Sequence, residues 1–555
     1  MKNEKRTTMN DISVLKWIYK SCGKRGKEVI ALVLLNAWSA LCVTLFAMLS
    51  KTVMDNAESS NREALIKNVI ILFLLIASQI ISRLISSYIE AVSQGKAEIA
   101  LKTHIFSSII YGTYANSAEH HSGDLMTRLT ADVLAVSDTY VHIIPALTGY
   151  AVRIISGAAA LFVLDRRFAL IFIVCGILII ITAALLRKHL KVLHRRVQER
   201  DSRVRSFMQE MLENLFAIKI FGIEDKIINR SIKQQKNFYR EKVRKKSFSI
   251  LASIGFSIAF GAGFLGAMAY GSYGVLKGTM TFGTVVAIIQ LVNQLQSPVM
   301  GITGVLPSFF GMTASAQRLI EVSSAERELK STAEAVGYES FERIKATGIS
   351  FGYGEEAVIS ESSFVIEKGD FVGIKGPSGA GKSTIFKLIT GLYTADEGEI
   401  HIETANGSIP CKEARSLYSV VPQGNMLFSG TVRENITMLR PDATEDEIEK
   451  ALSDSCAEFA KDLENGLDFI LGEDGAGLSE GQAQRLAIAR ALLGKGKILL
   501  MDEATSALDA DSENSLLEKL SARKDLTVLF VTHRDSVLEK CRRIITVSDG
   551  KIYEN

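Results

Sequence analysis

A glycine-rich loop in the second half of the chain carries the first residue types that point to chemistry. Its sequence, Gly376-Pro377-Ser378-Gly379-Ala380-Gly381-Lys382-Ser383, matches the pattern G-x-x-x-x-G-K-[ST]. Residues 371–374 before it are apolar and predict a buried strand, and residues 384–390 after it, which open with Thr384, predict a helix. Glycines let backbone N–H groups turn toward phosphate oxygens, Lys382 adds a positive charge, and the Ser383 hydroxyl is a ligand for Mg²⁺. The loop predicts a nucleoside triphosphate site; the alternative is a glycine-rich turn without a ligand.

Two adjacent carboxylates follow another apolar run. Residues 499–501 predict a strand that ends at Asp502 and Glu503, and we expect this strand to lie beside the phosphate-loop strand. Ligands of α/β sheets bind at the carboxyl ends of the strands. Asp502 would hold Mg²⁺ through water, whereas Glu503 would polarise the water that attacks the γ-phosphate. One carboxylate does not easily do both, so the pair indicates hydrolysis.

Three further side chains are candidates for the same site. His533 follows a predicted strand over residues 527–531 and would reach the γ-phosphate. Gln423, after another apolar stretch, would offer a neutral oxygen to the metal or the water. Tyr353 lies upstream of the loop and would stack on adenine; a surface tyrosine is the alternative.

A second anion site is predicted around residue 480. The segment Leu478-Ser479-Glu480-Gly481-Gln482 precedes a stretch rich in Ala, Leu, Ile and Arg that predicts a helix. Ser479 and the backbone N–H groups at that helix N-terminus suit a phosphate. Since one domain does not need two such sites, we expect a head-to-tail pair in which this segment closes on the nucleotide of a second copy.

The first half of the chain has the composition of a membrane domain. Apolar residues make up 47% of the chain, and the excess lies before residue 311. Six long apolar stretches each meet or approach the roughly 20 residues that cross about 30 Å of hydrocarbon. They cover residues 28–50, 65–88, 141–164, 168–186, 248–276 and 281–305. The predicted fold is therefore a polytopic α-helical membrane domain (1–310), a linker (311–345) and an α/β P-loop ATPase domain (346–555).

The links between these stretches alternate in length. Those after the first, third and fifth are short (51–64, 165–167 and 276–280), whereas those after the second and fourth predict long helices with tips near 114–122 and 214–225. The second long link is strongly basic, which places it in the cytosol by the positive-inside rule. Both termini and the ATPase domain then also lie in the cytosol. The sequence thus predicts a multi-pass protein of the cell membrane.

Two features inside the predicted spans each have two interpretations. Gln290, Asn293 and Gln294 share one helix face, and they either line a polar cavity or bond between helices. Arg153 falls near mid-bilayer, where a charge faces protein or water. It would either contact an anionic group on a substrate or form a structural ion pair.

Charge and cysteine usage exclude other classes. The net charge of +3 gives no indication of nucleic-acid binding. The six cysteines are scattered without a C-x-x-C pair, so they predict neither a zinc site nor a disulfide framework.

Taken together, these motifs resemble the ATP-binding cassette (ABC) transporters, specifically exporter-type half-transporters. The resemblance implies the Walker A loop at 376–384, the A-loop at Tyr353 and the Q-loop at Gln423. It also implies the signature at 478–482, Walker B at 498–502, the catalytic Glu503, the D-loop at 506–509 and the switch His533. The partner would be a second half-transporter, and one long-link tip would dock into its ATPase domain, as in a swapped arrangement.

Two departures from the family pattern stand out. Glu480 replaces a glycine of the signature, which adds negative charge near a phosphate and would slow hydrolysis there. A heterodimer's catalytic half carries a similar change, but Ser479, Gly481, Gln482, Glu503 and His533 are intact and favour a homodimer. Ile470 stands where the family often has a glutamate, and this difference affects how the ATPase domain would bind the tips of the long links.

Three hypotheses follow from this organisation. The first is an ATP-driven exporter of a lipid, a peptide or an amphipathic small molecule, working by alternating access in a dimer. The second is an importer of a metal-chelate compound with the same architecture. The third is an ATPase whose spans serve only as an anchor.

Overall fold

The computed structural model describes residues 11–23, 26–118, 120, 122–324, 327–328, 338–354, 356–424, 426–494 and 496–554. Two compact units result. The first consists of Met1–Ile110 and His121–Ser324, and the second of Tyr111–His120 and Ala325–Asn555. The boundaries expected at residues 310 and 345 stay a prediction, and part of the expected linker (residues 325–326 and 329–337) lies outside the described residues.

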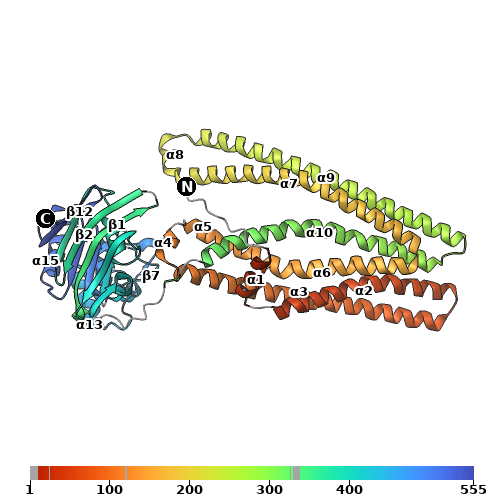
Figure 1. The fold of residues 1–555 in the computed structure, drawn as a ribbon, viewed down its shortest axis with the longest axis horizontal. Helices are drawn as coiled ribbons and strands as arrows, with labels where there is room; N and C mark the ends of the chain where they lie inside the picture. Colours follow the sequence, from red (N-terminus) through yellow and green to blue (C-terminus); the bar gives the residue numbers. More distant parts are fainter. Residues whose placement is uncertain are drawn as a thin grey trace. The chain divides into compact units, whose positions relative to one another are not determined.

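The first unit consists of helices (Figure 1). Six of its described helices are long, and they contain the six apolar stretches predicted from the sequence. They are α2 (Gly26–Glu58), α3 (Arg62–Ile110), α6 (Val133–Leu164), α7 (Arg166–Glu213), α9 (Glu224–Leu276) and α10 (Phe282–Ser323). The shorter elements are α1 (Asp11–Ser21), α5 (Ser122–Thr127), the π-helix η1 (Arg128–Asp132) and α8 (Leu215–Phe221).

Membrane-spanning character is found in four fully described segments. These lie in Gly26–Glu58, Arg62–Ile110, Ser122–Leu164 and Glu224–Leu276, and each is long and apolar enough to cross a bilayer. α7 and α10 carry the other two predicted stretches, and several of their side chains fall outside the described set.

Both predicted tips are confirmed as helical turns. α3 ends at Ile110 and α4 (Tyr114–Ala118) follows, so the first tip falls where it was expected. α7 and α9 run side by side and are joined through α8 (Figure 1). Gly222 ends α8 with a φ of +60°, a conformation that glycine adopts without strain.

Two apolar clusters hold the first unit together. In one, Val14 and Ile18 of α1 are fully buried against α3, α6 and α10. In the other, α2, α6, α7, α9 and α10 meet around Leu291. Gly271 of α9 permits close packing, because a Cβ there would lie 2.7 Å from Val285 of α10.

The second unit is built on a six-stranded sheet with the order β12-β11-β3-β10-β9-β6. Its strands β3, β6, β9, β10 and β11 are parallel, and β12 is antiparallel to β11. The bounds are β3 (Phe371–Lys375), β6 (Tyr418–Val421), β9 (Ile498–Asp502), β10 (Thr527–Val531), β11 (Arg543–Ser548) and β12 (Lys551–Glu554). The expectation that β9 lies next to the phosphate-loop strand β3 is wrong, because β10 lies between them and pairs with both.

Both faces of this sheet are covered. Leu500 and Leu529 pack on the side of α11 (Lys382–Ile389) and the antiparallel sheet β2-β1-β4-β5, whereas Met501 and Phe530 pack against α14 (Glu480–Leu493) and α15 (Ala510–Ser521). The alternation follows from side chains that point to opposite faces along a strand. The antiparallel strands are β1 (Phe341–Tyr353), β2 (Glu356–Glu367), β4 (Glu397–Thr404) and β5 (Gly407–Pro410). The remaining elements are β7 (Gly430–Thr431), β8 (Ile470–Leu471), α12 (Val432–Thr437), α13 (Glu445–Asp454) and α16 (Asp535–Leu538).

Candidate functional site

The phosphate loop lies between the end of β3 and the start of α11, as the sequence predicts. Gly379 and Gly381 have φ values of +80° and +98°, so the loop uses their conformational freedom. Gly376 has no room for a side chain, since a Cβ there would lie 2.2 Å from the Val547 carbonyl oxygen. The loop thus leads into the N-terminus of α11, the end of a helix that favours an anion.

Lys382 is held inside this loop. Its residue is only 6% exposed, and its Nζ donates to the carbonyl oxygens of Gly376 at 2.9 Å and Pro377 at 2.8 Å. Burial lowers the pKa of Lys382, while the charges of Glu503 and Asp502 oppose that effect. The lysine is thus a positive charge held inside the loop by two carbonyl oxygens.

Asp502 has the environment of a metal ligand. It lies at the end of β9 and is 9% exposed, and its Oδ1 is buried without a hydrogen-bond partner among the described residues. Burial raises the pKa of Asp502, and a hydrogen bond with Ser383 opposes this. A hydroxyl and a buried carboxylate oxygen without a partner are hard donors that fit Mg²⁺.

Glu503 stands next to Asp502 in a strained backbone conformation. Its φ is +50°, which a non-glycine residue rarely adopts, and its N–H donates to the Val531 carbonyl oxygen at 2.9 Å. Its carboxylate accepts a hydrogen bond from Nε2 of Gln423 at 2.8 Å and lies 3.9 Å from Nε2 of His533. Three predicted catalytic or metal-site residues therefore meet around one carboxylate.

Tyr353 lies beside the same loop. Its hydroxyl is 3.3 Å from Oγ1 of Thr384, and its ring makes edge-to-face contacts with Phe351 and Tyr393. The side chain is 42% exposed, which leaves ring surface for a base. The remaining loop residues Pro377, Ser378 and Ala380 lie on the turn between β3 and α11.

The signature segment lies at the N-terminus of α14, as expected. Oγ of Ser479 accepts from the N–H of Gln482 at 3.3 Å, and Oε1 of Gln482 accepts from the N–H of Ser479 at 3.0 Å. Gly481 is required here, because a Cβ would lie 2.6 Å from the Ala507 carbonyl oxygen. Among the described residues, no hydrogen bond or ion pair joins Ser479, Gly481 or Gln482 to the phosphate loop.

Two side chains that the sequence motifs did not single out complete the site. Buried Gln484 donates to the backbone oxygen of Glu503 at 3.1 Å and accepts from the N–H of Ala507 at 3.0 Å, which ties α14 to the strained residue. Arg534 donates to Glu513 at 2.7 Å and to the Thr505 carbonyl oxygen at 3.0 Å. No motif spacing predicts either pairing. The available indication in the sequence was that Gln484 lies two residues after Gln482 and that Arg534 directly follows His533.

Gln294 and Asn293 on the polar face of α10 agree with different interpretations, one with bonds between helices and the other with a polar cavity. Gln294 donates to the Val43 carbonyl oxygen of α2 at 2.7 Å and so bonds between helices. Asn293 is exposed, as the cavity interpretation requires. Arg153 donates to Oγ of Ser297 at 3.1 Å, and no carboxylate of the described residues pairs with it.

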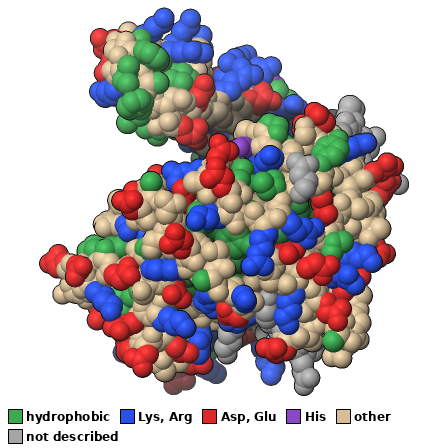
Figure 2. Space-filling view, turned by 90° about the vertical axis from the view of Figure 1, so that its left-hand side faces the viewer, with side chains coloured by type: hydrophobic (Ala, Val, Ile, Leu, Met, Phe, Trp, Pro, Cys, Tyr) green, Lys and Arg blue, Asp and Glu red, His purple; other side chains and the backbone are tan. Residues whose placement is uncertain are grey.

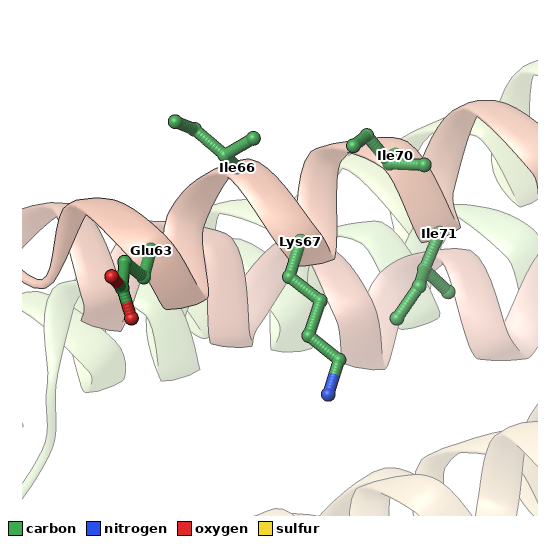
Figure 3. A pocket seen from close by; sticks show the side chains of 5 residues that line it. All are labelled: Glu63, Ile66, Lys67, Ile70 and Ile71. Atoms are coloured by element: carbon green, nitrogen blue, oxygen red, sulfur yellow. The ribbon is translucent and has the colours of Figure 1, made fainter.

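A groove of about 420 Å³ lies elsewhere, on α3. It is lined by Glu63, Ile66, Lys67, Ile70 and Ile71 (Figure 3). All five side chains come from consecutive turns of one helix, so the groove lacks the convergent polar groups of a ligand site.

A helical membrane domain in one chain with a phosphate loop, a paired carboxylate and a signature segment defines an ATP-powered membrane transporter. Residues 29–299 match the family described as ABC transporter transmembrane region, and residues 359–506 match the family described as ABC transporter. The chain belongs to the ABC transporters. It is a membrane protein that binds ATP and couples ATP hydrolysis to transport, and the predicted fold class is confirmed.

Individual relatives support this assignment. The chain is 30% identical over 542 residues to an ATP-dependent lipid A-core flippase of Haemophilus ducreyi, which covers 95% of this chain and 91% of the relative. It is 31% identical over 440 residues to a protein of the same name from Desulfotalea psychrophila, with 78% and 76% covered. The structure of a bacterial Atm1-family ABC exporter with ATP bound shares the fold, with a TM-score of 0.80, 22% identity, and 96% and 94% of the chains covered.

Proposed function

We propose that this protein exports an amphipathic substrate, such as a lipid, a peptide or a small molecule, by alternating access in a dimer. The membrane unit and the site around Lys382 and Glu503 belong to one chain, so hydrolysis acts directly on the spans. The relatives reported above are named as flippases and as an exporter. Their names support export over uptake of a metal chelate.

The nucleotide would lie between two copies. Ser479, Gly481 and Gln482 of one copy would close on the phosphate loop of the other, which accounts for an α14 N-terminus that, within the described part of the chain, shows no bond to its own loop. Ser383, Gln423 and Asp502 would hold Mg²⁺, which neutralises charge on the phosphates. Glu503 would orient and polarise the attacking water, and His533 would contact the γ-phosphate.

The second long-link tip supports a swapped dimer. Ile218 of α8 is buried, but other apolar side chains of this helix are strongly exposed, and Phe216 and Phe221 are 80% and 70% accessible. Figure 2 shows hydrophobic side chains gathered at the end of the upper lobe, where α8 lies in Figure 1. Such a patch on a cytosolic tip indicates a protein partner, and the ATPase domain of a second copy would cover it.

Orientation and partner follow from the same features. The basic link along α7 supports a cytosolic position for this link, both termini and the ATPase domain. A homodimer is the simpler partner, because Glu503, His533 and the rest of the signature are intact in this chain. Glu480 is exposed in the first turn of α14, where its charge would slow hydrolysis without abolishing it.

Arg153 suggests a chemical feature of the substrate. Among the described residues, Arg153 donates only to the hydroxyl of Ser297, which leaves N–H donors of this membrane-helix arginine for an anionic group. We therefore expect the substrate to carry a phosphate or carboxylate.

Transport into inverted vesicles tests export directly. Vesicles with the ATPase domain outside should accumulate an anionic fluorescent amphipath when ATP is added, and vesicles with Glu503→Gln should not. Loss of the amphipath from preloaded inverted vesicles would show uptake instead, and ATP turnover without any movement would contradict transport.

A further inference from the structure

Three tyrosines connect the expected base position to the first long-link tip within the second unit. The rings of Tyr353 and Tyr393 make an edge-to-face contact, with centroids 5.6 Å apart and an interplanar angle of 87°. Tyr393 makes the same kind of contact with Tyr114 of α4, at 5.7 Å and 89°. Tyr393 is therefore the shared neighbour of the base-facing ring and the tip.

The position of Tyr353 is fixed on its other sides. Buried Phe351 packs edge-to-face against it at 5.1 Å, and Thr384 lies 3.3 Å from its hydroxyl. Lys387 of α11 places Nζ 5.7 Å from the Tyr353 ring centroid and 5.9 Å from that of Tyr393. A base that moves the Tyr353 ring would therefore act on these contacts and on Tyr393, which in turn contacts the tip.

A backbone clasp holds the same tip to the ATPase domain. The N–H of Glu328 donates to the Tyr111 carbonyl oxygen at 2.8 Å, and Gly112 and Arg327 form an antiparallel bridge. Both carboxylate oxygens of Glu328 accept from Arg415, which also donates to the carbonyl oxygens of Thr390 and Gly391 after α11. The tip is tied to the phosphate-loop helix as well as to Tyr393.

We propose that Tyr393 is a positioning residue that couples the base bound at Tyr353 to the tip of the same chain through Tyr114. A base stacked on Tyr353 fixes that ring, which fixes Tyr393 and thereby the docked position of Tyr114. Because coupling between two sites is reciprocal, docking of the tip must equally strengthen binding of the base. The tip, which continues into α3 and α5, thus responds to the base as well as to the phosphates. This inference rests on the proposed stacking of adenine on Tyr353.

The test separates the base from the phosphates. In the full-length protein in nanodiscs, the KM for ATP is measured beside the inhibition constant of tripolyphosphate, which carries no base. Tyr393→Ala and Tyr114→Ala should each raise the KM for ATP by about two- to tenfold, the range for losing one or two aromatic contacts, and leave the tripolyphosphate constant and kcat unchanged. Tyr393→Phe should behave as the unaltered protein, since the ring is kept.

A matched control and a double variant sharpen the result. Tyr553 on β12 is a tyrosine of similar exposure, 49% against 41% for Tyr114, so Tyr553→Ala should change nothing. Tyr114→Ala combined with Tyr393→Ala should raise the KM no further than Tyr393→Ala alone, because Tyr114 acts through Tyr393.

Two outcomes would overturn the inference, and they are distinguishable from failure of the proposed site. If Tyr353→Ala raises the KM for ATP selectively but Tyr114→Ala does not, the base stacks and the tip is uncoupled from it. If Tyr114→Ala raises the KM and the tripolyphosphate constant together, the tip supports the whole loop rather than the base. If Tyr353→Ala leaves the ratio of the KM for ATP to the inhibition constant of tripolyphosphate unchanged, the proposed stacking fails and the inference fails with it.

Discussion

Gln423 donates a 2.8 Å hydrogen bond from its side-chain amide to the carboxylate of Glu503. The contact joins a residue two positions after β6 to the residue that follows β9, at the edge where the phosphate loop also lies. Binding of a metal and a γ-phosphate between them would require this bond to yield. The pair is therefore placed to report whether the site is loaded with MgATP.

Replacement of Glu503 by glutamine should separate binding from hydrolysis. The neutral amide keeps the shape of the side chain but cannot polarise water as a base, so the turnover rate should fall by about 10²- to 10⁴-fold. ATP affinity should be retained, and the closed dimer should accumulate. Phosphate release measures the turnover rate, and nucleotide binding measures the ATP affinity. Rapid turnover in this variant would show that Glu503 does not polarise the attacking water.

Asp502→Asn should have opposite effects with and without Mg²⁺. Burial raises the pKa of Asp502, so the carboxylate costs stability as the pH rises above its ordinary value of 3.8 toward the raised one. At neutral pH without metal, the variant should melt at the same temperature or higher. With MgATP it should lose the stabilisation that the unaltered protein shows, together with hydrolysis. A variant that is still stabilised by MgATP as strongly as the unaltered protein would show that Asp502 is no metal ligand.

The ion pair between Glu328 and Arg415 should be lost in acid. The Arg415 guanidinium lowers the pKa of Glu328, with the Tyr114 backbone N–H helping. The Glu328 carboxylate therefore contributes its full stabilisation of the folded state above the ordinary glutamate pKa of 4.5. This stabilisation disappears as the pH falls through the lowered pKa. Since the pair is about one-third exposed, Arg415→Ala should cost only about 1 kcal/mol, and the share of this cost that comes from the ion pair should depend on pH. Thermal unfolding from pH 7 to pH 3 should show the difference shrinking; Glu328→Gln is the control, and a constant difference would contradict the prediction.

Arg153 should decide the response to anionic amphipaths. Arg153→Ala should raise the concentration of dodecyl phosphate that half-maximally stimulates ATP hydrolysis by about tenfold or more, since a charge-assisted hydrogen bond is worth roughly 1.5–3 kcal/mol. Stimulation by a neutral amphipath of equal chain length should be unchanged. Ser297→Ala leaves the charge in place and should have a smaller effect. Equal losses for charged and neutral amphipaths would assign Arg153 a structural role.

The sequence predicted those features that are local. Six apolar stretches became long helices, and the loop around Lys382 lies between a strand and a helix because its glycines, lysine and flanking pattern are contiguous. Glu503 and Gln423 could be placed at one sheet edge because each follows an apolar strand.

Features that depend on the order of strands or on contacts between distant segments were not predictable in this way. The sequence of residues 498–502 does not indicate that β10 separates β9 from β3. All three strands are buried on both faces, so their sequences show the same continuous apolar pattern. Gln484 and Tyr393 lie outside the motifs, and their roles depend on which neighbour the fold brings to them.

Cross-linking between copies tests the central claim, that ATP is held between two ATPase domains, most directly. Ser378→Cys in the phosphate loop and Ser479→Cys in the signature segment would be introduced on separate copies in a Glu503→Gln background, then mixed and treated with a short bifunctional thiol reagent. The composite site predicts a cross-linked dimer that forms with MgATP and not without nucleotide, while either cysteine alone gives none. Equal cross-linking with and without nucleotide, or none in either condition while ATP still binds, would contradict the account.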